Sequence, residues 1–190
     1  APVALGYSDV SDSDWFKGAV SYASDNGLFQ GTGGGQFSPQ VSMSRAMYVT
    51  VLSRLEQNTF PDVIIAGDGG FSDVAAGVWY TTPVSWAADN DIVNGMGDGL
   101  FAPDFDVSRE QMVTILYRYC VYNGYAVSEA GNIDSYHDAA QVAEWALDAM
   151  RWACGAGVIK GDDMGNLNPQ ASATRAEAAQ MLKNFCEALE

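Results

Sequence analysis

The chain of 190 residues carries the same pair of residues three times in a nearly constant register. A serine or threonine precedes Arg45, Arg109 and Arg175, and these arginines are 64 and 66 residues apart. A proline lies six residues before each arginine and a glycine eight residues before each proline, the glycines being Gly31, Gly95 and Gly161. Because a Gly, Pro, Arg triplet in fixed register rarely arises by chance, we infer three copies of one unit.

Each unit opens with an aromatic residue, a polar residue and an aspartate, followed by a tryptophan six or seven residues later. The aspartates are Asp9, Asp73 and Asp138, and the tryptophans are Trp15, Trp79 and Trp145. After the tryptophan, apolar residues recur at helical spacing, which predicts a first helix that ends at the glycine (Gly95 in the second unit). Ser13 or Asp14 would cap this helix in the first unit. A glycine-rich turn then leads to the proline.

The Ser/Thr-Arg pair marks the start of a second helix. Thr174 and Glu177 have the spacing of a capping box, in which hydroxyl and carboxylate each bind a free amide of the helix end. Ser108 and Gln111 form a variant of this pattern, whereas Ser44 lacks a reciprocal partner. The second helix is therefore expected in all three units, with unequal caps.

These patterns predict an all-α fold of three helix-loop-helix repeats in one domain, 1–190. The repeats are expected at about 7–57, 71–121 and 136–190. Polar and glycine-rich linkers occupy roughly Gln57–Gly70 and Tyr122–Asp134.

Composition excludes several classes of function. The net charge of −15 comes from 9 basic and 24 acidic residues, so a phosphate backbone would repel the chain and nucleic acid is not an expected partner. No apolar run reaches the ~20 residues of a membrane-spanning helix, and no membrane insertion is expected. The start at Ala1 and Pro2, without an initiator methionine, indicates a processed or excised chain.

Catalysis, a cofactor and a metal site are not expected either. His137 is the single histidine, and the sequence contains neither HExxH nor GxSxG. Residues 162–166 lack the twelve-residue pattern of a calcium loop. Three cysteines cannot all pair, and Cys120 and Cys186 are repeat-equivalent, which favours free thiols in small apolar packing sites.

Several spaced motifs resemble the S-layer homology domain of bacterial cell-surface proteins. Phe71-Ser72-Asp73-Val74 and Thr174-Arg175-Ala176-Glu177 match its opening and closing motifs. Phe37-Ser38-Pro39 and Phe101-Ala102-Pro103 match its central motif, and Leu167-Asn168-Pro169 is a near match. The resemblance covers residues 7–190.

The resemblance implies a pseudo-threefold domain in which one helix from each repeat builds a central bundle. It also implies a non-catalytic module on the bacterial cell surface, in the cell wall or S-layer. Such modules bind secondary cell-wall polysaccharide, often with a pyruvylated amino sugar, in grooves between neighbouring repeats that include the motif arginine. The grooves are expected to be unequal, because the three motifs differ. The alternative is a structural or protein-docking module that binds other surface proteins.

Most groups of candidate site residues have a structural and a ligand-binding interpretation. The arginines would hold a sugar carboxylate in a bidentate manner, or would lock the repeats together by pairing with the three aspartates. The tryptophans would be core residues or sugar platforms. The aspartates would be caps, arginine partners or ligand contacts. The three glycines would allow both a tight turn and ligand access.

Overall fold

The computed structural model describes residues 6–67, 70–128 and 131–189. Residues 68–69 and 129–130, which fall in the two predicted linkers, and residues 1–5 and 190 at the ends of the predicted domain lie outside this description. The described residues contain six α-helices, two 3₁₀ turns and no strand, which confirms the all-α prediction. The helices are α1 (Lys17–Asp25), α2 (Arg45–Thr59), α3 (Thr81–Asp89), α4 (Arg109–Tyr122), α5 (Leu147–Gly155) and α6 (Arg175–Ala188).

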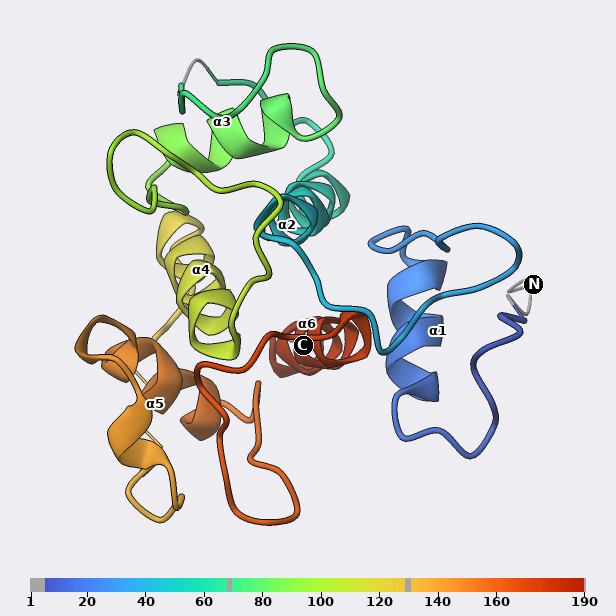
Figure 1. Cartoon of the computed structure of the whole chain (residues 1–190), viewed down its shortest axis with the longest axis vertical. Helices are drawn as coiled ribbons and strands as arrows, with labels where there is room; N and C mark the ends of the chain where they lie inside the picture. Colours follow the sequence, from blue (N-terminus) through green and yellow to red (C-terminus); the bar gives the residue numbers. More distant parts are fainter. Residues whose placement is uncertain (1–5, 68–69, 129–130, 190) are drawn as a thin grey trace.

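The three long helices lie at the centre and the three short ones outside them (Figure 1). Each short helix packs against the long helix of the preceding repeat: α3 on α2, α5 on α4, and α1 on α6. The last of these contacts joins the start of the chain to its end. The repeats therefore form a closed cycle in which every repeat contacts both others.

The long helices begin where the Ser/Thr-Arg pair predicts. Ser44, Ser108 and Thr174 are extended N-cap residues, and each side-chain oxygen accepts from the backbone amide three residues on. Complete capping boxes form at Ser108 with Gln111 and at Thr174 with Glu177. Ser44 caps without a reciprocal partner, as its sequence indicates.

The short helices begin and end differently from the prediction. The N-cap of α1 is Phe16, which has no side-chain cap, and the Asp14 carboxylate instead accepts from the backbone amide of Ser11 (2.7 Å). The helices also end before the predicted glycines. Each is terminated by a residue of positive φ (Gly27 at 66°, Asp91 at 57° and Gly157 at 71°), whose reversal of the backbone lets the next amide bond back to the last turn.

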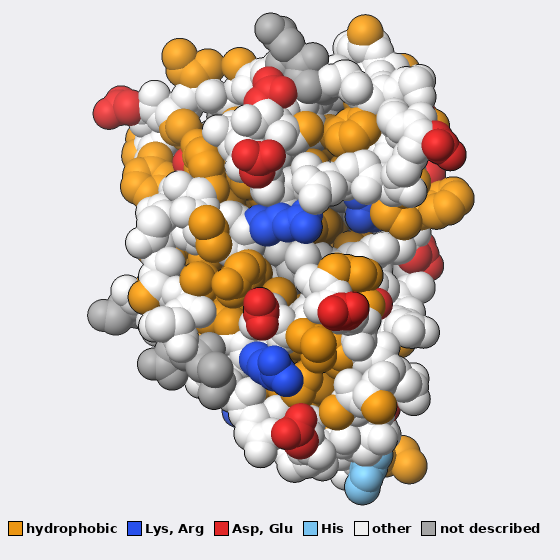
Figure 2. Space-filling model, turned by 90° about the vertical axis from the view of Figure 1, so that its left-hand side faces the viewer, with side chains coloured by type: hydrophobic (Ala, Val, Ile, Leu, Met, Phe, Trp, Pro, Cys, Tyr) orange, Lys and Arg blue, Asp and Glu red, His pale blue; other side chains and the backbone are white. Residues whose placement is uncertain are grey.

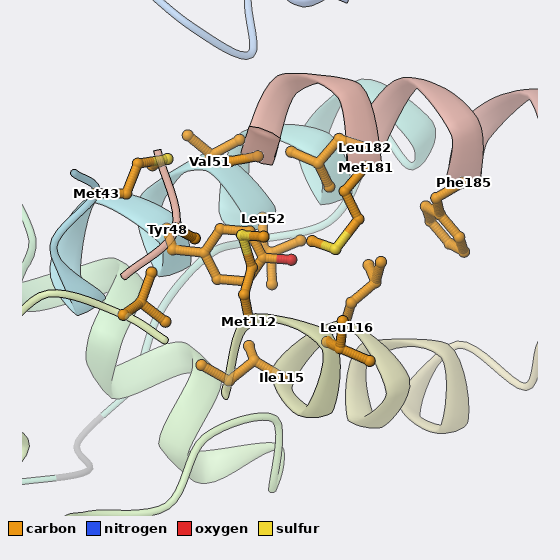
Figure 3. Close-up of a cluster of buried hydrophobic side chains, with 14 of the residues drawn as sticks. Met43, Tyr48, Val51, Leu52, Met112, Ile115, Leu116, Met181, Leu182 and Phe185 are labelled. Carbon is orange, nitrogen blue, oxygen red and sulfur yellow. The ribbon is translucent and has the colours of Figure 1, made fainter. Parts of the chain in front are cut away.

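The core runs along the centre of the three long helices. Leu52, Leu116 and Leu182 occupy equivalent positions in α2, α4 and α6, and all three are fully buried. Figure 3 shows these leucines together with Met112 and Met181 between the three helices. Each repeat thus contributes one apolar helix face to a core that no repeat could bury alone.

The C-terminal end of this core is polar. Glu56 is buried and accepts from the Tyr119 hydroxyl (2.9 Å) and from the Asn123 side-chain amide (3.1 Å). Cys120 and Cys186 stand at the equivalent positions in the other repeats, and within the described residues neither they nor Cys154 form a disulfide. Burial raises the pKa of Cys120 to about 12 and that of Cys154 to about 11, so these side chains remain protonated thiols at neutral pH.

Replacement of two buried tyrosines by phenylalanine should change the free energy of unfolding differently. Among the described residues, the Tyr48 hydroxyl has no hydrogen-bond partner, whereas the Tyr119 hydroxyl satisfies the buried Glu56. We expect Tyr48→Phe to leave the free energy of unfolding unchanged or to raise it by about 1 kcal/mol, because an unsatisfied polar group disappears. Tyr119→Phe should lower it by about 1–3 kcal/mol. Urea unfolding followed by circular dichroism measures both, and an equal loss in the two variants would contradict this account.

Candidate functional site

The turn before each long helix has a strained backbone. Ser38, Ala102 and Asn168, the residues immediately before the motif prolines, have φ values of 59°, 59° and 52°. Residues other than glycine rarely adopt this left-handed conformation, so the surrounding contacts must hold each turn in place. The apolar residues that precede them (Phe37, Phe101 and Leu167) are fully buried and anchor the turn to the core.

The three motif aspartates hold the amide side of these turns. Asp73 accepts from the backbone amides of Phe101 (2.8 Å) and Ala102 (2.7 Å). Asp9 and Asp138 accept from the equivalent two amides of their own turns. Both bonds of Asp9 are 2.8 Å long, and both bonds of Asp138 are 2.7 Å long. Burial raises the pKa of Asp73, but the hydrogen bonds from these amides outweigh it and leave the pKa below its usual range, as at Asp9. The aspartates therefore act as caps.

The motif arginines hold the carbonyl side of the same turns, each from the preceding repeat. The Nε atoms of Arg45, Arg109 and Arg175 donate to the carbonyls of Phe101 (2.9 Å), Leu167 (2.8 Å) and Phe37 (2.8 Å). The alternative of a direct ion pair between arginine and aspartate is not found among the described residues: the carboxylates accept from backbone amides, and each arginine donates to a backbone carbonyl. Arginine and aspartate still fix one turn together, from its two sides.

The third turn differs from the others in how it holds its arginine. Arg45 lies over the Phe101 ring (4.7 Å to the centroid) and Arg175 over the Phe37 ring (4.6 Å). Leu167 offers no ring to Arg109, which forms an ion pair with Glu177 instead (2.8 Å). The complete closing motif of the third repeat thus neutralises the arginine of the second.

The three conserved-register glycines are required by packing. A Cβ on Gly161 would lie 2.3 Å from the Tyr136 ring, and Cβ atoms on Gly31 and Gly95 would each lie 2.9 Å from the rings of Tyr7 and Phe71. The opening aromatic of each repeat therefore covers the glycine of the same repeat. Backbone carbonyl oxygens also lie within 2.9 Å of each such Cβ, so the close approach of a ring and of the backbone explains a glycine at these positions.

The motif tryptophans are not core residues. Trp15, Trp79 and Trp145 are exposed by 63%, 58% and 55%, so the core interpretation is wrong. Trp15 and Trp79 each lie edge-on to the next residue, Phe16 and Tyr80, with ring centroids 5.3 and 5.0 Å apart. Each therefore presents an aromatic face of large area to solvent.

Two surface grooves bring tryptophans and arginines of different repeats together. We number each groove after the repeat whose turn and long helix line it. Groove 1, of about 130 Å³, is lined in part by Trp79, Arg175, Arg54, Met47 and Gln30. Groove 3, of about 580 Å³, is lined in part by Trp15, Arg109, Lys160, Glu177 and Asn184, and it also includes Gly161. Each groove combines an arginine of one repeat, the turn and long helix of the next, and a tryptophan of the third. Trp145 lines neither groove.

Sequence reasoning missed one basic position that faces the grooves. Nine residues after each motif arginine stand Arg54, Arg118 and Asn184. Arg54 donates to the Leu28 carbonyl (2.9 Å) and Asn184 to the Val158 carbonyl (3.1 Å), so the position has the same place in both repeats. The shared register was a usable signal, since three residues at one interval include two of the nine basic side chains.

Basic side chains are visible at more than one place on the surface. Figure 2 shows, on one face, two neighbouring patches of Lys and Arg side chains in the middle and a separate one below, with hydrophobic and acidic side chains around them. A third hollow of about 250 Å³ lies at the C-terminal end of the core, lined in part by Tyr22, Tyr119 and Tyr125. No predicted site residue lines it.

The profile of the S-layer homology domain matches residues 6–46, 70–113 and 135–179. The chain belongs to the S-layer homology family. This confirms the resemblance and the predicted cell-surface location. The matched segments contain the aspartate, the tryptophan, the glycine and the arginine of every repeat, and therefore the turns described above.

Relatives in this S-layer homology family include surface proteins and enzymes. The chain is 30% identical, over 92% of its length, to the surface-layer 125 kDa protein of Lysinibacillus sphaericus, of which it spans 14%. It is 28% identical over 97% of its length to exoglucanase XynX of Acetivibrio thermocellus, of which it spans 16%. It is 24% identical over 84% of its length to a cellulosome-anchoring protein of the same species, spanning 35% of that protein. It thus corresponds to one part of much longer proteins.

Two further features bear on how such a module could act. Within the described segments, no helix is both long enough and apolar enough to span a membrane. The same segments contain no cluster of three or more His, Cys, Asp or Glu residues arranged to hold a metal ion.

The two hydrogen bonds that Asp73 accepts from the turn lead to a pH-dependent prediction. Asp73→Asn should lower the free energy of unfolding at pH 7 by about 1–3 kcal/mol, because an amide oxygen replaces a carboxylate that accepts two bonds. The pKa of Asp73 is lowered in the folded state, so its contribution is present above its unfolded value of about 3.9 and is lost as the pH falls through the folded value. The free energies of unfolding of the variant and the wild type should therefore become more similar below about pH 4.

Urea titrations at pH 7, 5 and 3 measure this difference. Asp104→Asn removes an exposed carboxylate of the same repeat and serves as the control, with little expected effect at any of the three pH values. A loss in Asp73→Asn that stays constant down to pH 3 would contradict the assignment.

Proposed function

We propose that this module holds a bacterial surface protein on the cell wall by non-catalytic binding of an anionic, pyruvylated wall polysaccharide in the grooves between repeats. The observation that carries this proposal is the pairing, across repeats, of an exposed tryptophan with arginines in one groove. An exposed indole offers a flat apolar face to a sugar ring, and a guanidinium group binds a carboxylate.

The family and the relatives support the anchoring part of the proposal. Membership of the S-layer homology family fits a module for attachment to the cell surface. One relative is itself named a cellulosome-anchoring protein, and another is a surface-layer protein. The enzymes among the relatives match this chain over only a small part of their length, which fits a tether separate from the catalytic region.

The proposed ligand residues take different roles in this account. In the two grooves, Trp15 and Trp79 contact the sugar, and the arginines bind its acidic substituent. The aspartates and glycines act indirectly, because they hold the turns whose carbonyls orient the arginines.

Removal of the exposed tryptophans tests the proposal. Trp79→Ala and Trp15→Ala should each weaken the binding of purified pyruvylated wall polysaccharide on the order of tenfold, as expected for a contact aromatic. Both should unfold at nearly the wild-type temperature, since more than half of each side chain is exposed. Isothermal titration calorimetry measures the affinity and differential scanning calorimetry the stability.

Two controls accompany this experiment. Ile64→Ala removes a highly exposed apolar side chain outside the grooves and should bind like wild type. Mild acid treatment of the polysaccharide removes the ketal and should weaken the binding, because the arginines then lose their carboxylate partner. If the wild-type protein binds neither polysaccharide, a docking function toward another surface protein replaces this proposal.

A further inference from the structure

The two grooves carry different charges, although they are built by equivalent residues. Arg54 and Arg175 line groove 1, and no carboxylate of the described residues lines it. Groove 3 contains Arg109 and Lys160 together with Glu177, Asp162 and Asp163. Groove 1 is therefore cationic, whereas the basic and acidic side chains of groove 3 compensate one another.

Neither arginine of groove 1 forms an ion pair among the described residues. Arg175 uses its guanidinium group on the carbonyls of Phe37 (2.8 Å) and Gln30 (2.7 Å), and Arg54 donates to the Leu28 carbonyl (2.9 Å). The ion pairs of the described residues are Lys17 with Asp12, Arg109 with Glu177, and Lys183 with Glu187, so neither arginine takes part in one.

The two arginines also repel each other. Burial lowers the pKa of Arg175, and the charge of Arg54 lowers it further, while Tyr7 and Asp9 act in the opposite direction. Arg175 is almost fully buried, but Arg54 is only partly buried. An incoming anion would therefore meet Arg54 first, with Arg175 reinforcing the positive potential behind it.

Groove 3 lacks these features at the same positions. Asn184 replaces Arg54, and Glu177 stands where groove 1 has Met47. Arg109 is already paired with Glu177, so a carboxylate ligand would have to displace a partner from it.

We infer that Arg54 makes groove 1 selective for a sugar that carries a carboxylate, whereas groove 3 accepts sugars irrespective of charge. This selectivity rests on the proposed function and adds a division of labour between the grooves. Arg118 occupies the equivalent place in the second repeat, where Arg45 also lacks an ion pair among the described residues. The arginine at this position, and not the completeness of the closing motif, is the specificity determinant.

A matched pair of probes tests the selectivity. One probe is the methyl glycoside of an N-acetylhexosamine with a 4,6-linked pyruvate ketal, and the other is its uncharged methyl ester. The indole N–H signals of Trp79 and Trp15 in ¹H–¹⁵N spectra report groove 1 and groove 3 separately. The acid should bind at Trp79 at least about tenfold more tightly than the ester, as expected for a charge-assisted hydrogen bond. At Trp15 the two affinities should agree within about twofold.

Exchange of residues between the repeats supplies the variants. Arg54→Asn gives groove 1 the residue of groove 3 and should lower the affinity for the acid to that for the ester, which removes the preference. Arg151→Asn removes the same charge from an exposed site on α5 and should preserve the preference. The double variant Asn184→Arg with Glu177→Met should confer the preference on groove 3.

The outcomes separate this inference from the proposal beneath it. Equal affinities of acid and ester at Trp79, or equal effects of Arg54→Asn and Arg151→Asn, would overturn the selectivity while polysaccharide binding stands. If neither probe moves either indole signal and the polysaccharide does not bind, both are overturned. Thermal unfolding of every variant confirms that a loss of binding is not a loss of fold.

Discussion

The structure depends on one short turn that is held from both sides. In each repeat a carboxylate binds two backbone amides of the turn, and an arginine from the preceding repeat binds the adjacent carbonyl. The turn has a backbone conformation that is unfavourable for its residues, and this double grip keeps it. Since the arginine and the aspartate belong to different repeats, the same contact that shapes the turn also joins the repeats. Local conformation and assembly therefore depend on each other.

Much of the fold could be predicted from the sequence because it is encoded locally. The starts of the long helices follow from Ser44, Ser108 and Thr174, whose side chains act on amides three residues away. The ends of the short helices were harder, because Asp91 adopts a positive φ that glycine takes at the equivalent positions. Contacts between residues within about four positions can be predicted from the sequence. Which residue adopts a positive φ at the end of a helix cannot be predicted in the same way.

The site was less predictable, because its residues meet across repeats. The register shows that Trp79 and Arg175 have counterparts in every repeat, but it contains no information on which repeats are neighbours. For the same reason the sequence left open whether the tryptophans are buried or exposed: whether a ring is covered depends on the element packed beyond it. Glu177 fitted a cap in the sequence, and its bond to Arg109 appears only when the second and third repeats are placed together.

The cyclic contacts also fix how many repeats one such unit contains. Every repeat contributes an arginine on one side and a turn on the other. The arginine of the third repeat binds the turn of the first. An interface of this kind between unlike surfaces either closes into a ring or continues indefinitely. Here it closes after three copies, so an additional repeat would find no vacant partner surface. A longer array would have to begin a second, separate ring, and attachment strength would then increase in steps of three repeats.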